Sequence, residues 1–223
     1  MSKKNEIYNK IFEGDGSLNE DGVSLEDFVK NYDPGMYENP SPTVDTAVFS
    51  YKDISGKIIS GLKLLLVKRR NHPSIGFWAL PGGFVELNEG ICEAAARELM
   101  EETGVTDITP VQVKAFGSPE RDPRTTIITT LFTAMVKEDL ICPKAGDDAA
   151  DAAFFDIEVK EENDLIFLTL ENKEKDLKLS AKLKKHRTQS GVLSSEYFEL
   201  LGSDRIAMDH AILIIEAFRF INR

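Results

Sequence analysis

A cluster of glutamates around one arginine is the part of this sequence best suited to chemistry. Glu98, Glu101 and Glu102 are spaced i, i+3 and i+4, so on a helix their side chains project from one face. Residues 91 to 103 contain nothing that breaks a helix, and a run of alanines there favours one. Glu89 lies just before this helix and can fold back toward it. A carboxylate-only set suits a hard cation, Mg²⁺ or Mn²⁺, and no Cys/His set suggests zinc.

The alternative interpretation of these acids is a solvated acidic helix face. Two features of the sequence argue against it. Arg97 interrupts the cluster where it can pair with Glu101 at i+4. The Pro-Gly-Gly of residues 81 to 83 and the closing Gly104 frame the segment as strand, loop and helix. We therefore predict a metal site here.

The same segment resembles the Nudix box. That pattern reads glycine, five residues, glutamate, seven residues, Arg-Glu, an aliphatic residue, any residue, Glu-Glu, any residue, glycine and an aliphatic residue. Its fixed positions are all met, by Gly83, Glu89, Arg97, Glu98, Leu99, Glu101, Glu102, Gly104 and Val105.

The resemblance implies both a fold and an activity. The fold is α/β, a Nudix-type α/β/α sandwich with a mixed sheet and, in this chain, a C-terminal hairpin plus helix. The activity is hydrolysis of a nucleoside diphosphate linked to another moiety, with Mg²⁺ or Mn²⁺ as cofactor. Arg97 would orient the helix carboxylates. The residues expected at the metal are Glu98 and Glu102 as main ligands, with Glu101, Glu89 and the carbonyl of Gly82 in support.

The general base is expected on a later loop. Asp147 and Asp148 are candidates, of which we select Asp148, and Glu120 is another. A turn with a cap remains an alternative interpretation of the Asp pair.

Other segments resemble the branch that contains ADP-ribose pyrophosphatases and Nudix-related regulators of NAD metabolism. They are residues 32 to 45, 116 to 124, 146 to 149 and 208 to 211, with Pro119 fifteen residues beyond Gly104. The resemblance implies that ADP-ribose is hydrolysed to AMP and ribose 5-phosphate.

Four side chains are predicted to bind that substrate. Arg121 and Arg124 would clamp the phosphates or the terminal ribose, with surface salt bridges to Asp122 or Glu120 as the alternative. Arg70 could reach the diphosphate. Phe77 could stack on a base, whereas its neighbour Trp78 is expected in the core.

Two other functions share the box. The first is an ADP-ribose-sensing regulator, which in that branch carries a winged-helix DNA-binding domain. Because the chain reaches Arg223 soon after its last predicted helix, we expect no such domain and favour an enzyme. The second is hydrolysis of an oxidised nucleoside triphosphate, for which no base pocket is evident.

Composition bounds the partners. A net charge of −11 disfavours nucleic acid, although residues 173 to 187 are basic and form either a solvated hairpin or an anion contact. No apolar run approaches the roughly 20 residues that span a bilayer, and no secretory signal is evident, so neither a membrane nor export is expected. With two cysteines, Cys92 and Cys142, a reducing cytoplasm is expected. Cys92 is predicted to be a small core residue.

The chain is predicted to divide into an N-terminal extension (1–42), a Nudix domain (43–157) and a C-terminal hairpin and helix (158–223) packed on it. An apolar last helix and the inserted hairpin predict a homodimer. The expected elements are helices at 25–31 (capped by Ser24), 91–103 and 208–221, strands at 43–51, 63–68, 111–116, 126–136 and 152–156, and hairpin arms at 166–170 and 177–183.

Overall fold

The computed structural model describes residues 11–12, 14–55, 58–106, 108–140 and 149–223, and the chain forms two compact units, Met1–Asn39 and Pro40–Arg223. In the first unit, helix α2 (Leu25–Asn31) begins where predicted, because the Ser24 hydroxyl accepts a hydrogen bond from the Asp27 amide at 3.1 Å. A short 3-10 turn, η1 (Pro34–Met36), follows. None of the α2 residues is buried. The predicted division at 42/43 and 157/158 stays a prediction.

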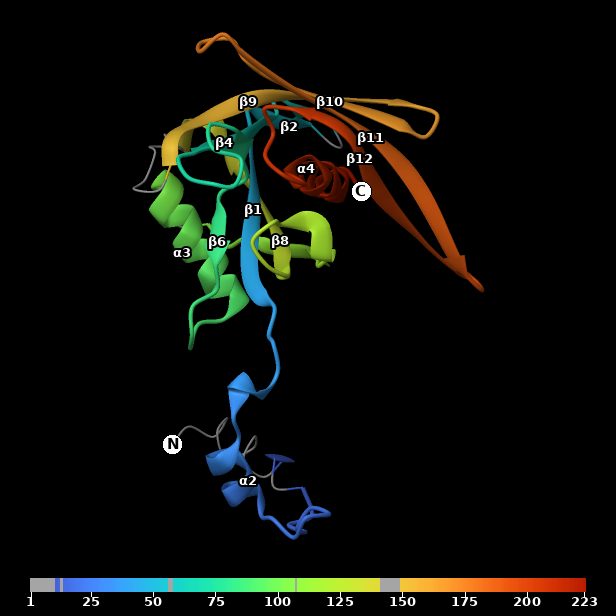
Figure 1. The fold of residues 1–223 in the computed structure, drawn as a ribbon. Helices are drawn as coiled ribbons and strands as arrows, with labels where there is room; N and C mark the ends of the chain where they lie inside the picture. Colours follow the sequence, from blue (N-terminus) through green and yellow to red (C-terminus); the bar gives the residue numbers. More distant parts are fainter. Residues whose placement is uncertain (1–10, 13, 56–57, 107, 141–148) are drawn as a thin grey trace. The chain divides into compact units, whose positions relative to one another are not determined.

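The second unit is built on a ten-stranded mixed sheet (Figure 1). Its strands follow the order β12-β11-β10-β9-β4-β1-β8-β7, with β5 added to β4 and β6 added to β1. Within the described residues, β1 and β8 are the one strand pair of the main sheet that runs parallel. The bounds are β1 Ser41–Tyr51, β4 Lys63–Arg69, β5 Trp78–Ala79, β6 Gly82–Phe84, β7 Val111–Phe116, β8 Ile127–Lys137, β9 Ala149–Glu162, β10 Leu165–Asn172, β11 Leu177–Ser190 and β12 Leu193–Asp204, with β2 Asp53–Ser55 and β3 Ile58–Ser60 as a separate hairpin and η2 Pro119–Arg121 and η3 Glu138–Leu140 as 3-10 turns.

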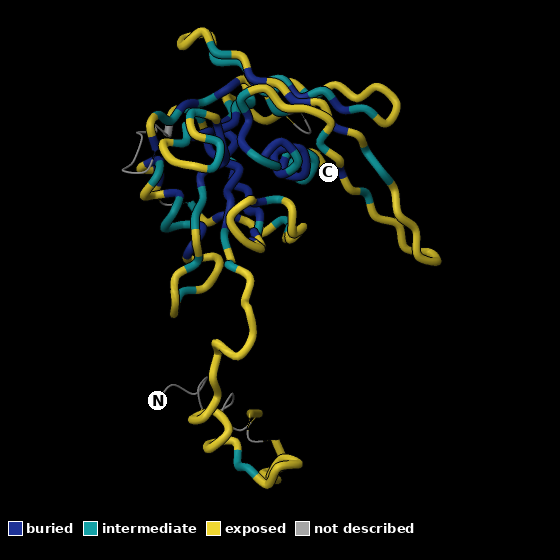
Figure 2. The backbone as a smooth tube through the Cα atoms, in the orientation of Figure 1, coloured by how far each residue is buried: buried dark blue, intermediate teal, exposed yellow. Residues whose placement is uncertain are grey.

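Two helices cover opposite faces of the sheet. Strand β1 shows why, since its alternate side chains point to opposite sides. Val44 packs with Ala95 of helix α3 (Ile91–Thr103), whereas Ala47 and Phe49 belong to the core built around helix α4 (His210–Ile221). The predicted α/β/α sandwich is confirmed. Figure 2 shows the buried residues concentrated on the central strands and on α4.

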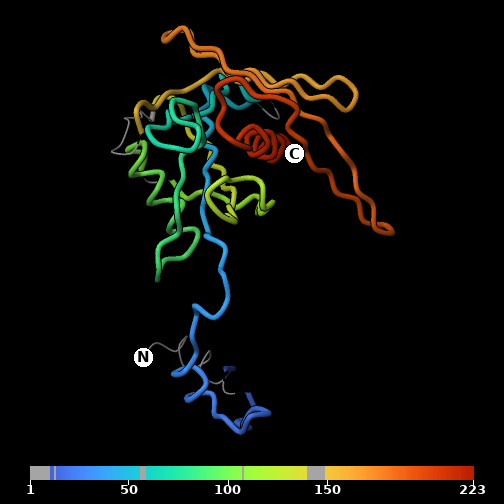
Figure 3. The backbone as a smooth tube through the Cα atoms, in the orientation of Figure 1, coloured from blue at the N-terminus to red at the C-terminus, as the bar shows by residue number. Residues whose placement is uncertain are grey.

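The C-terminal strands are longer than predicted. The expected hairpin arms are confirmed as β10 and β11, but β9 extends to Glu162 and a further strand, β12, was not predicted. Figure 3 shows β4 and β9, far apart in sequence, running side by side, as their pairing requires. The far ends of β11 and β12 are exposed (Figure 2).

Two residues test the predicted core. Trp78 is buried against Phe155, with ring centroids 4.9 Å apart, as expected. The prediction for Cys92 was wrong, because its place on α3 leaves it exposed. None of the described helices is long and apolar enough to cross a membrane.

Candidate active site

Two glycines allow the loop before α3 to approach the central strand. Strand β6 pairs with β1, placing Gly82 opposite Asp45 and Gly83 opposite Val44. A Cβ atom on Gly82 would overlap the carbonyl oxygen of Val44, and one on Gly83 would overlap the carboxylate of Glu98. Close approach therefore requires glycine at both positions.

Helix α3 then presents its acids, and Gly104 ends it in the left-handed conformation, at φ 70°. Arg97 binds three of the carboxylates. Its guanidinium donates to Glu89 at 2.7 and 3.0 Å, to Glu98 at 2.8 Å and to Glu101 at 3.0 Å. It also donates to the carbonyl of Phe84 at 3.0 Å. The predicted i+4 pair is confirmed, and Glu89 does fold back.

These contacts change the ionisation of the groups involved. Hydrogen bonds from Arg97, with one from the Glu86 amide, lower the pKa of Glu89 to about 2. The same bond to Glu89 is the main reason that the pKa of Arg97 is raised. Arg97 is thus a fixed cation that anchors the carboxylates.

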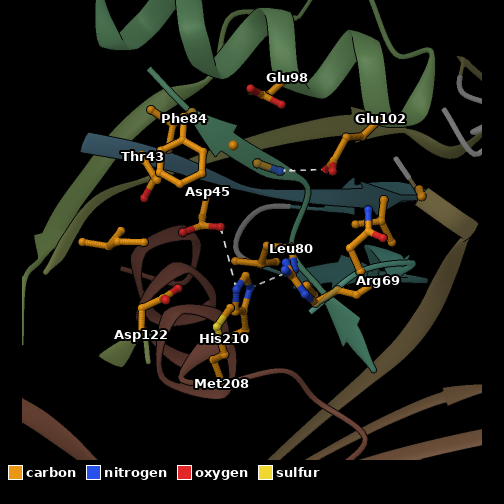
Figure 4. Close-up of a pocket in the computed structure, with 18 of the residues that line it drawn as sticks. Thr43, Asp45, Arg69, Leu80, Phe84, Glu98, Glu102, Asp122, Met208 and His210 are labelled. Carbon is orange, nitrogen blue, oxygen red and sulfur yellow. Dashed lines mark hydrogen bonds and ion pairs between the residues drawn. The ribbon is translucent and has the colours of Figure 1, made fainter. Parts of the chain in front are cut away.

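The acids bound to or near Arg97 divide into two groups. Glu98 and Glu102 line a pocket of about 380 Å³ (Figure 4), whereas Glu101, with 51% of its side chain exposed, and Glu89 are not among the described residues that line it. Glu102 accepts a hydrogen bond from the Gly82 amide at 2.9 Å.

Burial raises the pKa of Glu102 to about 8, and the nearby charges of Glu98 and Asp45 add to the shift. Burial also raises the pKa of Glu98, against the opposing effect of Arg97.

Arginines provide the opposite charge in the same pocket. Arg69, at the end of β4, is fixed by donating to the carbonyl of Pro73 at 2.7 Å, and burial followed by the charge of Arg124 lowers its pKa. Arg124 also lines the pocket, and its guanidinium lies 5.4 Å from the ring centroid of Phe84. Carboxylates and guanidinium groups therefore share one concave site.

The predicted substrate-binding residues fall into different places. Arg70 lines the pocket and donates to the carbonyl of Ala149 at 2.9 Å. Arg124 pairs with Asp122 at 2.9 Å, as the alternative interpretation proposed. Phe77 is partly exposed and is not among the described residues lining the pocket.

Arg121 differs from the prediction in its partner. Its side chain is only 6% exposed and binds Asp209 through two hydrogen bonds of 2.9 and 3.1 Å, so a surface bridge to Asp122 or Glu120 was the wrong alternative. Glu120 is exposed. Asp147 and Asp148, the candidate bases, lie outside the described residues.

Asp45 and His210 are among the pocket residues that sequence reasoning missed. Asp45 accepts a hydrogen bond from the Thr129 hydroxyl at 2.6 Å, and the ring of His210 accepts one from the Leu80 amide at 3.0 Å. His210 is the first residue of α4, and it is only 3% exposed and lines the pocket. The sequence did contain a signal for Asp45, because it is an acid within a strand that is largely buried.

The donors present fit a divalent cation. Among the described residues no three Asp, Glu, His or Cys side chains converge as a complete metal cluster. Glu98 and Glu102 nevertheless line one pocket, and their raised pKa values show that burial destabilises their ionised forms. A hard cation would stabilise those forms. Mg²⁺ is commonly bound by one or two carboxylates, with waters and substrate phosphates completing its shell.

The raised pKa of Glu102 predicts how stability depends on pH without a divalent ion. The folded state holds the proton up to about pH 8, whereas the unfolded chain releases it near 4.5. This contribution is therefore complete below about pH 4.5 and is lost as pH rises to 8, at a cost of about 5 kcal/mol. Urea unfolding in EDTA would measure it. A Glu102→Gln variant should lack this decrease, and an equal decrease in both proteins would contradict the assignment.

Comparisons with known proteins agree with this geometry. The family model described as NUDIX domain matches residues 53–171. The chain is 44% identical over 122 residues to an ADP-ribose pyrophosphatase of Methanocaldococcus jannaschii, covering 55% of this chain and 65% of that protein. It is 36% identical over 122 residues to the ADPR responsive transcriptional repressor NtrR of Acinetobacter baylyi, covering 54% of this chain and 46% of that protein.

A solved structure extends the likeness. The MutT/nudix family protein from Enterococcus faecalis superposes with a TM-score of 0.67 at 33% identity, covering 99% of this chain and 74% of that chain. The chain spans less than two thirds of the length of both curated relatives. The box geometry, the matched domain and this superposition together show that the chain belongs to the Nudix family.

Proposed function

We propose that this protein is a divalent-metal-dependent hydrolase that cleaves ADP-ribose to AMP and ribose 5-phosphate. The observation that carries the proposal is the pairing of Glu98 and Glu102 with arginines in one pocket. A diphosphate is anionic, so it cannot approach two carboxylates unless cations intervene. Arg69 and Arg124 supply fixed positive charge near the same space.

The residues of the chain would divide the work. Glu98 and Glu102 hold the cation, with the Gly82 carbonyl as a further ligand. Glu89 and Glu101 support them through Arg97, which binds Glu98. A cation held there would supply Lewis-acid chemistry, polarising the phosphoryl oxygens and lowering the pKa of a coordinated water.

The reaction itself is a displacement at phosphorus. Water adds to one phosphorus atom, the bridging P–O bond breaks, and the released phosphate keeps the bridging oxygen. Arg69, Arg70 and Arg124 would stabilise the charge on the phosphates. Asp148 stays our predicted general base, which would accept the proton of the attacking water.

The choice of ADP-ribose rests on both curated relatives, whose names give it as a substrate in one case and as an effector in the other. The repressor supports a second candidate function, in which this chain senses ADP-ribose without hydrolysing it. We favour hydrolysis because every fixed position of the box is present and Glu102 faces the pocket.

A substrate panel separates these functions. ADP-ribose, other nucleoside diphosphate sugars, NADH, dinucleoside polyphosphates and oxidised dGTP would each be incubated with Mg²⁺ and with Mn²⁺. We expect ADP-ribose to give the highest kcat/KM. A higher kcat/KM for oxidised dGTP would mean that ADP-ribose is not the preferred substrate. Binding of ADP-ribose without turnover of any compound would support the second function, an ADP-ribose sensor.

Assembly and location complete the proposal. We propose a homodimer in a reducing cytoplasm, on the basis of the long exposed β11–β12 hairpin and the two cysteines. A monomer at micromolar concentration in light scattering would contradict the dimer.

A further inference from the structure

The floor of the pocket holds a donor and an acceptor that face each other without touching. Asp45 comes from β1 and His210 from the start of α4, and both side chains are almost fully buried. The Asp45 Oδ1 and His210 Nε2 atoms are 3.9 Å apart (Figure 4). That distance is too long for a direct hydrogen bond.

The hydrogen bond from Leu80 decides which nitrogen of His210 carries the proton. The Leu80 amide donates to Nδ1 at 3.0 Å. A ring nitrogen that accepts a hydrogen bond carries no proton, so the neutral imidazole has its N–H at Nε2. His210 therefore presents a fixed donor toward Asp45.

Asp45 presents the complementary acceptor. Its Oδ2 accepts the Thr129 hydroxyl at 2.6 Å, whereas its Oδ1 has no hydrogen-bond partner among the described residues. The pocket thus holds one open donor beside one open acceptor, and a hydroxyl group is both.

The charge of Asp45 disfavours a phosphate at this position, although Arg69 lies close enough for its charge to interact with that of Asp45. Asp45 would repel it, and Arg121, the nearby cation, is already bound by both carboxylate oxygens of Asp209. Figure 4 shows His210 on the side of Asp45 away from Glu98. A diphosphate held at the carboxylates of α3 would therefore direct one of its linked groups toward this floor.

We propose that Asp45 and His210 form a subsite for a ribose hydroxyl, with Oδ1 accepting the hydroxyl proton and the Nε2–H donating to its oxygen. The subsite rests on the proposed function for the position of the diphosphate. The hydroxyl belongs either to the ribose of the nucleoside or to the ribose at the other end of the substrate, and the two sources present the same chemistry.

Binding measurements with a hydrolysis-resistant ligand test the subsite without relying on turnover. The ligand is ADP-ribose with a methylene group in place of the bridging oxygen, titrated with Mg²⁺ in a calorimeter. Two further ligands lack the 2- and 3-hydroxyls, one on the terminal ribose and one on the adenosine ribose. Each is titrated into wild type, Asp45→Asn and Asp209→Asn. The asparagine at 45 keeps the shape and can still accept from Thr129, and Asp209 belongs to the same network without lining the pocket.

We expect removal of the hydroxyls from one ribose to weaken wild-type binding about 10- to 100-fold, because the donor and acceptor are left unpaired. In Asp45→Asn the same removal should change the affinity by less than about threefold. Asp209→Asn should discriminate as wild type does. The ribose whose hydroxyls matter identifies the source.

The remaining outcomes separate the subsite from the function. Equal affinity of wild type for all three ligands, or no binding of any, would overturn the subsite, and this arm does not require that the variant folds. An equal loss for all ligands in Asp45→Asn would make Asp45 structural. Hydrolysis of ADP-ribose without discrimination between the hydroxyl variants would leave the proposed function intact and contradict the subsite. Discrimination without hydrolysis would contradict the proposed hydrolase function and support the subsite.

Discussion

Replacing Glu102 with glutamine is expected to lower kcat for ADP-ribose about 1,000-fold or more. Glutamine keeps the size of the side chain but removes the negative charge that would hold the cation, and metal stabilisation supplies several kcal/mol in such reactions. The variant should fold well, because the neutral amide avoids the cost of a buried charge that raises the pKa of Glu102 to about 8. Steady-state kinetics with product chromatography would measure the loss.

Two matched variants sharpen this test. Glu101 points away from the pocket toward Arg97, so Glu101→Gln should cost only about tenfold. Glu158→Gln, on an exposed part of β9, should behave as wild type. Equal losses at positions 101 and 102 would contradict the division of the acids that the structure indicates.

Alanine substitutions of the two glycines before α3 are expected to have different effects, one mainly on kcat and the other mainly on stability. In Gly83→Ala the new Cβ would lie within 2.5 Å of the Glu98 Oε2, so that carboxylate must move. Because the obstacle is the end of a side chain, we expect kcat to fall about 100-fold with a stability loss of about 1 kcal/mol.

In Gly82→Ala the obstacle is backbone. The Cβ would overlap the Val44 carbonyl and lie 2.9 Å from the Asp45 Cα, so the pairing of β6 with β1 must change. We expect about 3 kcal/mol of destabilisation. Urea denaturation and kinetics on both variants would measure the losses of stability and of kcat. A stable Gly82→Ala together with an unfolded Gly83→Ala would contradict the expected difference between them.

Local features of the sequence predicted helix α3 well. The bounds of α3 and the left-handed Gly104 depend on helix propensity and capping within a few residues. The pairing of Arg97 with Glu101 follows from helix spacing. The placement of α2 is equally local, because Ser24 caps it.

Features that depend on distant contacts were not predictable from the sequence. Strand β12 is largely exposed and lacks a clear apolar alternation, and its pairing with β11 defines it. His210 reaches the pocket because the chain after β12 pairs beside Trp78, with Ala207 donating to the Trp78 carbonyl at 2.8 Å. Arg121 meets Asp209 across 88 residues for the same reason. Cys92 was misplaced because helix propensity does not indicate which face is covered.

The proposed function requires that the carboxylates of α3 hold a divalent cation while a diphosphate bond is hydrolysed. The most direct test is to incubate wild type and Glu102→Gln with ADP-ribose, with Mg²⁺ or with EDTA, and to identify the products by chromatography. We expect AMP and ribose 5-phosphate to form only from wild type with Mg²⁺. Equal product formation in EDTA, or from Glu102→Gln at the wild-type rate, would contradict it.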